Sequence, residues 1–304
     1  MAEPREAQAV PVTLSTASVY PRRAAFAFEV AAELGYDGVE VMVWSDPATQ
    51  DPAQLRRLSD EHGMPIRSVH APTLLVSQRV WGRSPADKLR RSVDMAGELG
   101  AATVVVHPPF RWQYKYARQF QDLVHELNQA SPNQASLDQA GRHQDGGVTV
   151  AVENMYPWKP RSRGDRELKA YLPGWDPADH DYDAVTLDLS HAAIAHQDGL
   201  ALVHGFGDKL RHVHLADGTA SGRDEHMVPG RGDMACDKVL EELARRGYAG
   251  DVVVEISTRK ARTASERHAD LQAALKFARA HLAPVPEPYQ PPPPEHHHLP
   301  ADAW

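Results

Sequence analysis

Cysteine is nearly absent from this chain of 304 residues, which contains only Cys236. One thiol excludes a disulfide framework and any metal cluster built from several cysteines, and it fits a reducing compartment. Long apolar runs are also lacking, because no stretch approaches the roughly 20 residues that a membrane-spanning helix needs. The first ten residues, MAEPREAQAV, contain no apolar core of a signal peptide. We therefore expect a soluble cytoplasmic protein without a membrane partner.

An excess of basic residues is lacking as well. Lys and Arg number 33 against 41 Asp and Glu, and the formal net charge is −8. Nucleic-acid-binding proteins are normally basic, so this balance disfavours nucleic acid as a partner without excluding a local basic patch. Apolar residues make up 42% of the chain, which is enough for a full globular core.

Strand-like and helix-like segments alternate along most of the chain. We expect strands at 11–16, 38–44, 66–70, 103–107, 148–153, 185–189, 210–215 and 252–256. We expect helices at 22–35, 51–63, 84–100, 116–130, 236–247 and 265–282. Repetition of strand, helix and strand predicts parallel strands with right-handed crossovers, and eight such units close most simply into a (β/α)₈ TIM barrel. A doubly wound open sheet is the alternative, but no glycine-rich phosphate turn follows the first strand.

The composition changes at both ends of the predicted barrel. We expect a flexible N-terminus over 1–9, one barrel domain over 10–282, and a disordered tail over 283–304 that is rich in proline and contains three consecutive histidines, His296 to His298. The polar stretch 131–147 is interpreted as a long connection between a helix and a strand. Self-association into a homo-oligomer is compatible with this organisation.

Ionisable residues recur where the predicted strands end. Because the carboxyl ends of barrel strands converge on one mouth, these side chains should lie close together. They are His70, His107, Glu153, Asp188, His214 and Glu255, followed in nearby loops by His191, Asp224 and His226. A single histidine or carboxylate at a strand end is usually structural, but several carboxylates in one place repel each other unless cations intervene. Imidazole and carboxylate without thiolate form the ligand set of zinc, manganese, iron or cobalt, so we expect a site for divalent metal.

The segments around these residues resemble a known family. SVHAP, VVVHPP, VAVENM, LDLSH, HVHLADG and VVVEIS together resemble the xylose-isomerase-like TIM-barrel superfamily over residues 10–282. That superfamily contains sugar isomerases and epimerases, inosose-processing enzymes and endonuclease IV. The resemblance therefore implies metal-dependent chemistry on a small carbohydrate or on a phosphoester.

Two branches of the superfamily compete. Resemblance to the epimerases implies one metal ion held by Glu153, Asp188, His214 and Glu255, with the two glutamates exchanging carbon-bound protons. His191 would then contact the substrate as a further catalytic residue. Resemblance to endonuclease IV implies three zinc ions instead, and all nine ligand types are present: His70, His107, Glu153, Asp188, His191, His214, Asp224, His226 and Glu255.

The chain departs from endonuclease IV at segments that touch DNA or its surroundings. Ala71-Pro72-Thr73 replaces a serine-tyrosine pair, Ser190 replaces a cysteine, and residues 215–218 replace an Asn-Asp-Ser-Lys segment. These departures and the acidic charge favour a small-molecule substrate. We expect an isomerase or epimerase of a sugar, sugar phosphate or cyclitol, with the hydrolase as the alternative. Trp44, Tyr156 and Trp158 are candidates for an apolar wall against the substrate.

Overall fold

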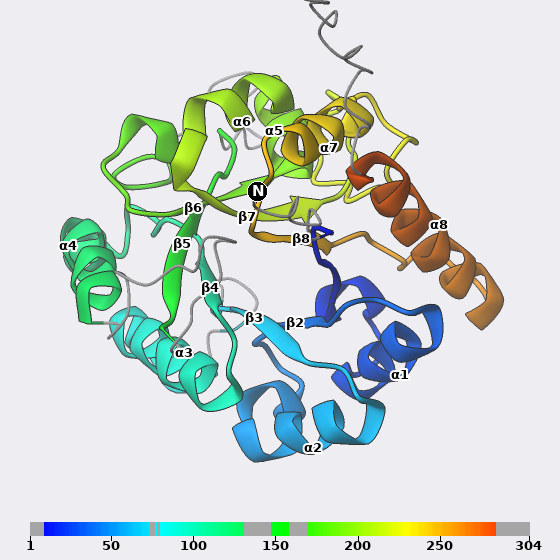
Figure 1. Ribbon diagram of the computed structural model, residues 1–304. Helices are drawn as coiled ribbons and strands as arrows, with labels where there is room; N and C mark the ends of the chain where they lie inside the picture. The colour runs from blue at the N-terminus through cyan, green and yellow to red at the C-terminus, as the bar shows by residue number, and fades with distance from the viewer. Residues whose placement is uncertain (1–8, 73–76, 78–79, 131–146, 158–168, 284–304) are drawn as a thin grey trace, which may run out of the picture.

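Eight parallel strands close into a barrel in the order in which they occur along the chain. The structure is a computed structural model that describes residues 9–72, 77, 80–130, 147–157 and 169–283. The strands are β1 (Val12–Ser15), β2 (Val39–Met42), β3 (Ile66–His70), β4 (Thr103–Val106), β5 (Thr149–Glu153), β6 (Val185–Asp188), β7 (Leu210–Leu215) and β8 (Asp251–Val254). Figure 1 shows them at the centre of a ring of helices. The (β/α)₈ barrel predicted from the sequence is therefore confirmed.

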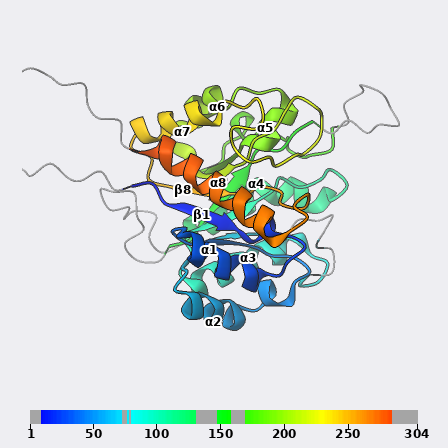
Figure 2. The ribbon, with the colours of Figure 1, turned by 90° about the vertical axis from the view of Figure 1, so that its right-hand side faces the viewer.

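The helices form the outer layer. They are α1 (Ala24–Leu34), α2 (Pro52–His62), α3 (Pro85–Leu99), α4 (Tyr114–Ala130), α5 (Leu189–Ala195), α6 (Gly199–Phe206), α7 (Cys236–Arg245) and α8 (Ala264–Leu282). Short 3₁₀ helices occur at η1 (Thr16–Val19), η2 (Pro47–Gln50), η4 (Pro177–Asp179) and η5 (Gly207–Lys209). The last helix, α8, packs against β1 and β8, where the barrel closes (Figure 2).

Capping residues fix the ends of several helices at the positions that the sequence indicates. The Ser84 hydroxyl accepts a hydrogen bond from the backbone N–H of Asp87, and the Asp51 carboxylate accepts from Ala53 and Gln54. Glycines in the left-handed conformation end α1, α2 and α3 at Gly35, Gly63 and Gly100. These caps explain why those helix boundaries were predicted closely.

The connection after β6 differs from the expectation. It contains two helices, α5 and α6, that the sequence pattern did not predict. Six of the seven residues of α5 are buried, so the helix has no polar stripe and shows no amphipathic period. Between β5 and β6, the described residues 154–157 and 169–184 contain no α-helix.

The two faces of the strands differ in chemistry. Alternate positions such as Leu14, Val41 and Leu187 belong to an apolar core that also includes the helices. The positions between them carry buried polar groups, which point into the barrel because successive side chains in a strand alternate. These groups are Thr13, Ser15, Glu40, Ser68, His70, Glu153, Thr186, Asp188, His212 and His214.

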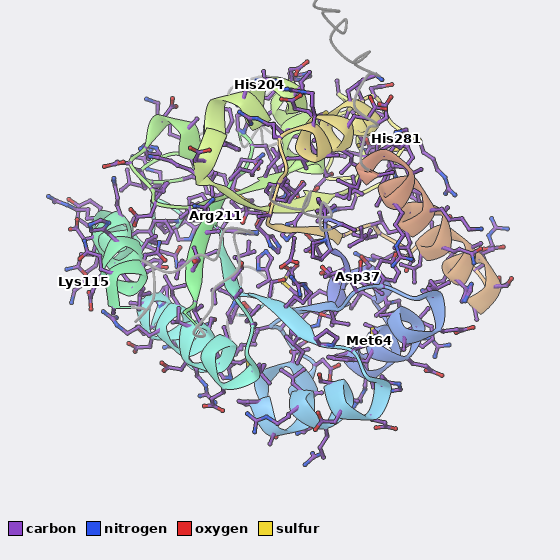
Figure 3. All side chains as sticks on the ribbon, in the orientation of Figure 1. Asp37, Met64, Lys115, His204, Arg211 and His281 are labelled. Carbon is purple, nitrogen blue, oxygen red and sulfur yellow. The ribbon has the colours of Figure 1, made fainter. Side chains whose placement is uncertain are left out.

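The outer surface is rich in charged side chains. Figure 3 shows Lys115 and His204 at the periphery, whereas Arg211 lies closer to the axis. Across the described ranges, every helix is too short or too polar to cross a membrane. The expectations for the N-terminus (residues 1–8), for 131–146 and for the tail beyond 283 concern residues outside those that the structure describes.

Candidate metal centre

The carboxyl ends of the barrel strands bring the predicted ligands together. Most are almost completely buried, whereas His107 has 26% of its side chain exposed. Ligand atoms within 4.8 Å of one another define four groups. Three contain predicted ligands alone: His70 with His107 and Glu153; Glu153 with Asp188, His214 and Glu255; and Asp188 with His191 and His226. The fourth joins His214 to Glu40 and His212. The convergence expected from the strand ends is therefore present in the geometry.

Glu153 joins two of these groups through its two carboxylate oxygens. Its Oε2 lies 2.8 Å from His107 Nε2 and 3.2 Å from His70 Nε2. Its Oε1 lies 3.2 Å from His214 Nδ1 and 3.3 Å from His191 Nδ1. A carboxylate in this position can bridge two cations or serve one cation and a substrate.

His214 lies at the centre of the four-residue group. Its Nδ1 is 2.9 Å from Glu255 Oε2 and 3.6 Å from Asp188 Oδ2. Glu153 and Glu255 thus approach one imidazole nitrogen from two different strands. Two candidate acid/base groups therefore lie beside the same imidazole nitrogen.

Asp224 and His226 lie nearer the solvent than the buried Asp188 does. Asp224, whose side chain is 34% exposed, has Oδ1 at 3.0 Å from His226 Nε2 and Oδ2 at 3.5 Å from His191 Nε2. The Ser190 hydroxyl donates to Asp224 Oδ1 and accepts from the backbone N–H of His226. Ser190 therefore holds the 224–226 loop against the start of α5.

The Asn154 side chain joins the end of β5 to the end of β6 at the site. The Asn154 amide donates to the Asp188 carbonyl at 3.0 Å and accepts from the Asp188 N–H at 2.6 Å. Asp188 is also the N-cap of α5, where its Oδ1 accepts from the backbone N–H of His191 at 2.8 Å. The spacing Asp-x-x-His is thus a capping geometry that places His191 over the cluster.

Opposite charges shift the titration of the clustered groups. Burial alone would lower the pKa of His214, but Glu255, Glu40 and Glu153 raise this pKa well above its ordinary value. Burial opposes ionisation of Glu153, yet His107 and His214 hold the pKa of this carboxyl well below its usual range. Asp224 likewise outweighs burial and raises the pKa of His226 to about 10. The carboxylates therefore require positive charge beside them, which protonated imidazoles or a metal cation can supply.

One atom supports a cation in particular. Asp188 Oδ2 is buried without a hydrogen-bond partner, and it faces His214 Nδ1 and, at 3.9 Å, His191 Nδ1. A buried carboxylate oxygen left unpaired is costly, and a cation among these ligands would satisfy it. The oxygen and nitrogen donor set fits zinc, manganese, iron or cobalt.

The three aromatic candidates are placed differently. The Tyr156 ring lies 5.1 Å from the His191 ring, measured between centroids, and therefore borders the cluster. Trp44 packs edge-on against Tyr20 at 5.3 Å, on the β1–β2 side of the mouth. Trp158 lies outside the described residues.

Two buried residues of the site were not predicted. Glu40 on β2 and His212 on β7 hydrogen-bond with each other, and Glu40 also contacts His214. The sequence contained two indications that these residues lie inside the barrel. Glu40 is a charged residue within the apolar run GVEVMVW, and His212 alternates with His214 in HVH.

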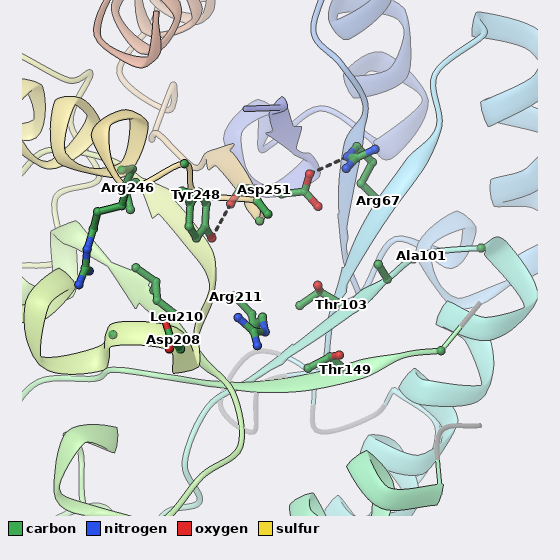
Figure 4. Close-up of a pocket in the computed structure, with 18 residues that line it drawn as sticks. Arg67, Ala101, Thr103, Thr149, Asp208, Leu210, Arg211, Arg246, Tyr248 and Asp251 are labelled. Carbon is green, nitrogen blue, oxygen red and sulfur yellow. Dashed lines mark hydrogen bonds and ion pairs between the residues drawn. The ribbon is translucent and has the colours of Figure 1, made fainter. Parts of the chain in front are cut away.

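A separate cavity occupies the opposite end of the barrel (Figure 4). Its volume is about 420 Å³, and Thr103, Thr149 and Arg211 are among the residues that line it. Arg67 Nε donates to Asp251 Oδ1 at 2.6 Å in the wall of this cavity. Enzymes with this fold react at the carboxyl-terminal end of the strands, and the residues known to line this cavity include none of the predicted ligands. The group of predicted ligands is therefore the better candidate site.

Related sequences include both uncharacterised proteins and a named epimerase. An uncharacterized protein of Mycobacterium tuberculosis is 47% identical over 290 residues, which cover 90% of this chain and 98% of the relative. A fructoselysine 3-epimerase of Shigella flexneri is 23% identical over 254 residues, which cover 76% of this chain and 84% of the relative.

Solved structures with the same fold include an epimerase-like protein and an AP endonuclease. A D-tagatose 3-epimerase-like protein superposes with a TM-score of 0.60 at 23% identity, covering 90% of this chain and 100% of that one. An AP endonuclease, family 2, from Brucella melitensis gives 0.56 at 20% identity, covering 82% of this chain and 94% of that one. These likenesses establish the fold alone. Residues 28–281 match the profile of the xylose isomerase-like TIM barrels, and the chain belongs to that family.

Proposed function

We propose that this protein is a divalent-metal-dependent isomerase or epimerase of a sugar, sugar phosphate or cyclitol. The observation that carries the proposal is the group of Glu153, Asp188, His214 and Glu255, whose ligand atoms lie within 4.8 Å of one another. The names of the fructoselysine 3-epimerase and the D-tagatose 3-epimerase-like protein support a carbohydrate substrate.

The two glutamates would perform the proton transfer. A bound Zn²⁺, Mn²⁺ or Co²⁺ would polarise the substrate's carbonyl and hydroxyl oxygens and so acidify the neighbouring C–H bond. Glu153 is ionised at neutral pH, because the neighbouring imidazoles hold its pKa well below its usual range, and it would be the group that receives that proton. Glu255 would return a proton from the other side, and His191 and Tyr156 would hold the substrate.

A specific observation favours a second function. Eight of the nine ligands that the resemblance to endonuclease IV implies lie in the three groups, and Glu153 and Asp188 each belong to two of them. The ninth, Asp224, lies within 3.5 Å of both His191 and His226. A site with several metal ions suits phosphoester hydrolysis, because it can stabilise both the attacking and the leaving oxygen. The alternative is therefore a multinuclear zinc phosphoester hydrolase.

Metal content and proton exchange test the proposal together. Protein purified without chelator should contain one divalent ion per chain and should incorporate deuterium from D₂O into a ketose or a related substrate. Glu153→Gln and Glu255→Gln should each stop this incorporation, whereas Glu126→Gln, an exposed residue of α4, should leave it intact. Three zinc ions per chain with cleavage of an abasic-site duplex would overturn the epimerase in favour of the hydrolase.

A further inference from the structure

Glu40 is a fully buried carboxylate one layer below the predicted ligands. It comes from the middle of β2 and is 0% exposed. Its Oε1 lies 3.1 Å from His214 Nε2, and its Oε2 accepts from Ser68 Oγ and His212 Nε2, each at 2.8 Å. The residue has no role in the ligand set considered above, yet it directly contacts one of its members.

The partner of His214 differs from those of the neighbouring histidines. In His70, His191 and His226, Nδ1 faces a backbone carbonyl, of Ala71, Asn154 and Glu255 respectively, at 3.0, 2.9 and 2.7 Å. In His214 the nitrogen turned away from the cluster faces the carboxylate of Glu40 instead. A carboxylate carries a full negative charge, and such a partner orients a ligating imidazole and increases its basicity.

The surroundings of Glu40 hold it in place. His212 Nδ1 is buried without a hydrogen-bond partner, so this ring is placed to donate through Nε2 to Glu40. Ser68 donates from β3, and His212 and His214 donate from β7. Three donors from two other strands thus fix both oxygens of one carboxylate.

We propose that Glu40 is a positioning residue for His214. By accepting the Nε2 proton, it presents Nδ1 to the group of Glu153, Asp188 and Glu255 and makes this group the tightest metal site of the cluster. The inference rests on the metal centre of the proposed function. It adds Glu40 as a residue that acts through His214, and it states which group of ligands should bind metal most tightly. It concerns metal binding, so its test does not depend on knowing the substrate.

The decisive experiment is a titration of the metal-free protein with Co²⁺ alone, followed by visible absorption. Glu40→Gln keeps the shape of the side chain and removes its charge. Loss of such a partner typically weakens metal binding about 10- to 100-fold, and we expect that decrease in the affinity for the first equivalent of Co²⁺. The ligand-field bands should shift at the same time, because the His214 nitrogen becomes a weaker donor.

Asp251→Asn is the matched control. It also replaces a buried carboxylate of the barrel interior by its amide, and it breaks the ion pair with Arg67 at the opposite end of the strands. Because this site is remote from the cluster, the Co²⁺ affinity should stay within about twofold of the original value. If Glu40→Gln fails to fold, Ser68→Ala, which removes one donor to Glu40, should weaken Co²⁺ binding in the same direction by a smaller factor.

Two results would overturn the inference. Unchanged Co²⁺ affinity and spectrum in Glu40→Gln, or in Ser68→Ala if only that variant folds, would show that His214 needs no charged partner. Loss of one whole equivalent of bound metal with the first site unchanged would show that Glu40 is itself a ligand, together with His212. If the unsubstituted protein bound no Co²⁺ at all, the proposed metal-dependent function would itself be wrong. That result differs from unchanged Co²⁺ binding in Glu40→Gln, which would contradict only the role of Glu40.

Discussion

The outer and the inner faces of the barrel strands have opposite chemistry. The outer positions are valine and leucine packed under the helices, as in Leu187 and Val213. The inner positions, where barrels of this fold usually carry branched apolar side chains, here carry Glu40, His212 and the ligands above them. Burying these charges costs free energy that the outer core must offset. Alternate residues of the same strand therefore have different roles: the outer ones stabilise the fold and the inner ones form the candidate site. Single substitutions on one face or the other should affect these two properties separately.

Replacement of Glu153 should have the largest effect on function. Glu153→Gln leaves a group that cannot accept a proton, and loss of an acid/base residue typically reduces turnover by about 10²- to 10⁴-fold. It also removes a ligand shared by two groups, so the metal content should fall. Deuterium exchange and metal analysis measure the two effects, and cooperative thermal unfolding should persist. Full turnover in Glu153→Gln would show that this inner-face carboxylate is not the base.

Replacement of Leu187 should reduce stability and leave metal binding unchanged. This residue lies next to Asp188 in β6, but its side chain is 0% exposed in the outer core. Leu187→Ala should lower the free energy of unfolding by about 2–5 kcal/mol, which denaturant titration measures, and should leave the metal affinity of the folded protein close to the original. Leu58→Ala, at a partly buried position of α2, should cost less. A loss of metal affinity as large as that of Asp188→Asn would break the separation of the two faces.

The predictable part of the site followed from one geometric rule. Strand ends converge in a barrel, so His70, Asp188 and His214 could be grouped before any coordinates were known. Glu40 lies two positions before Met42 on β2, and His212 lies two positions before His214 on β7, so both are on the inner face. The rule considers only the strand ends and therefore does not include these two positions. Following every second residue back from each strand end would have identified Glu40 and His212. The pairing of individual atoms, such as Glu40 with His214 Nε2, depends on side-chain orientation and register and could not be predicted.

The pH should act in opposite directions on the metal-free and the metal-bound protein. Raised histidine pKa values, about 10 for His226, contribute stability that is fully present below the ordinary value of 6.5 and is lost as the pH rises towards 10. Metal binding needs deprotonated imidazole, so the affinity should increase with pH over the same range, about tenfold per unit for each proton released. Unfolding of chelator-treated protein and Co²⁺ titrations at pH 6.5, 7.5 and 8.5 measure the two trends. Parallel trends would contradict the pairing of these histidines with the carboxylates beside them.

Asp224→Asn should have the smallest effect, and it separates the two candidate functions. In an epimerase with one ion, the partly exposed Asp224 only holds His191 and His226, so its loss should reduce turnover about three- to tenfold and leave one ion bound. In a hydrolase with three ions it would be a ligand, and one equivalent of zinc should disappear together with phosphoester cleavage. Ser190→Ala is the matched control, because it removes the hydrogen bond to Asp224 while keeping the carboxylate. A loss of zinc in Asp224→Asn but not in Ser190→Ala would assign the carboxylate to a metal ion, and equal modest losses in both would assign it to positioning the loop.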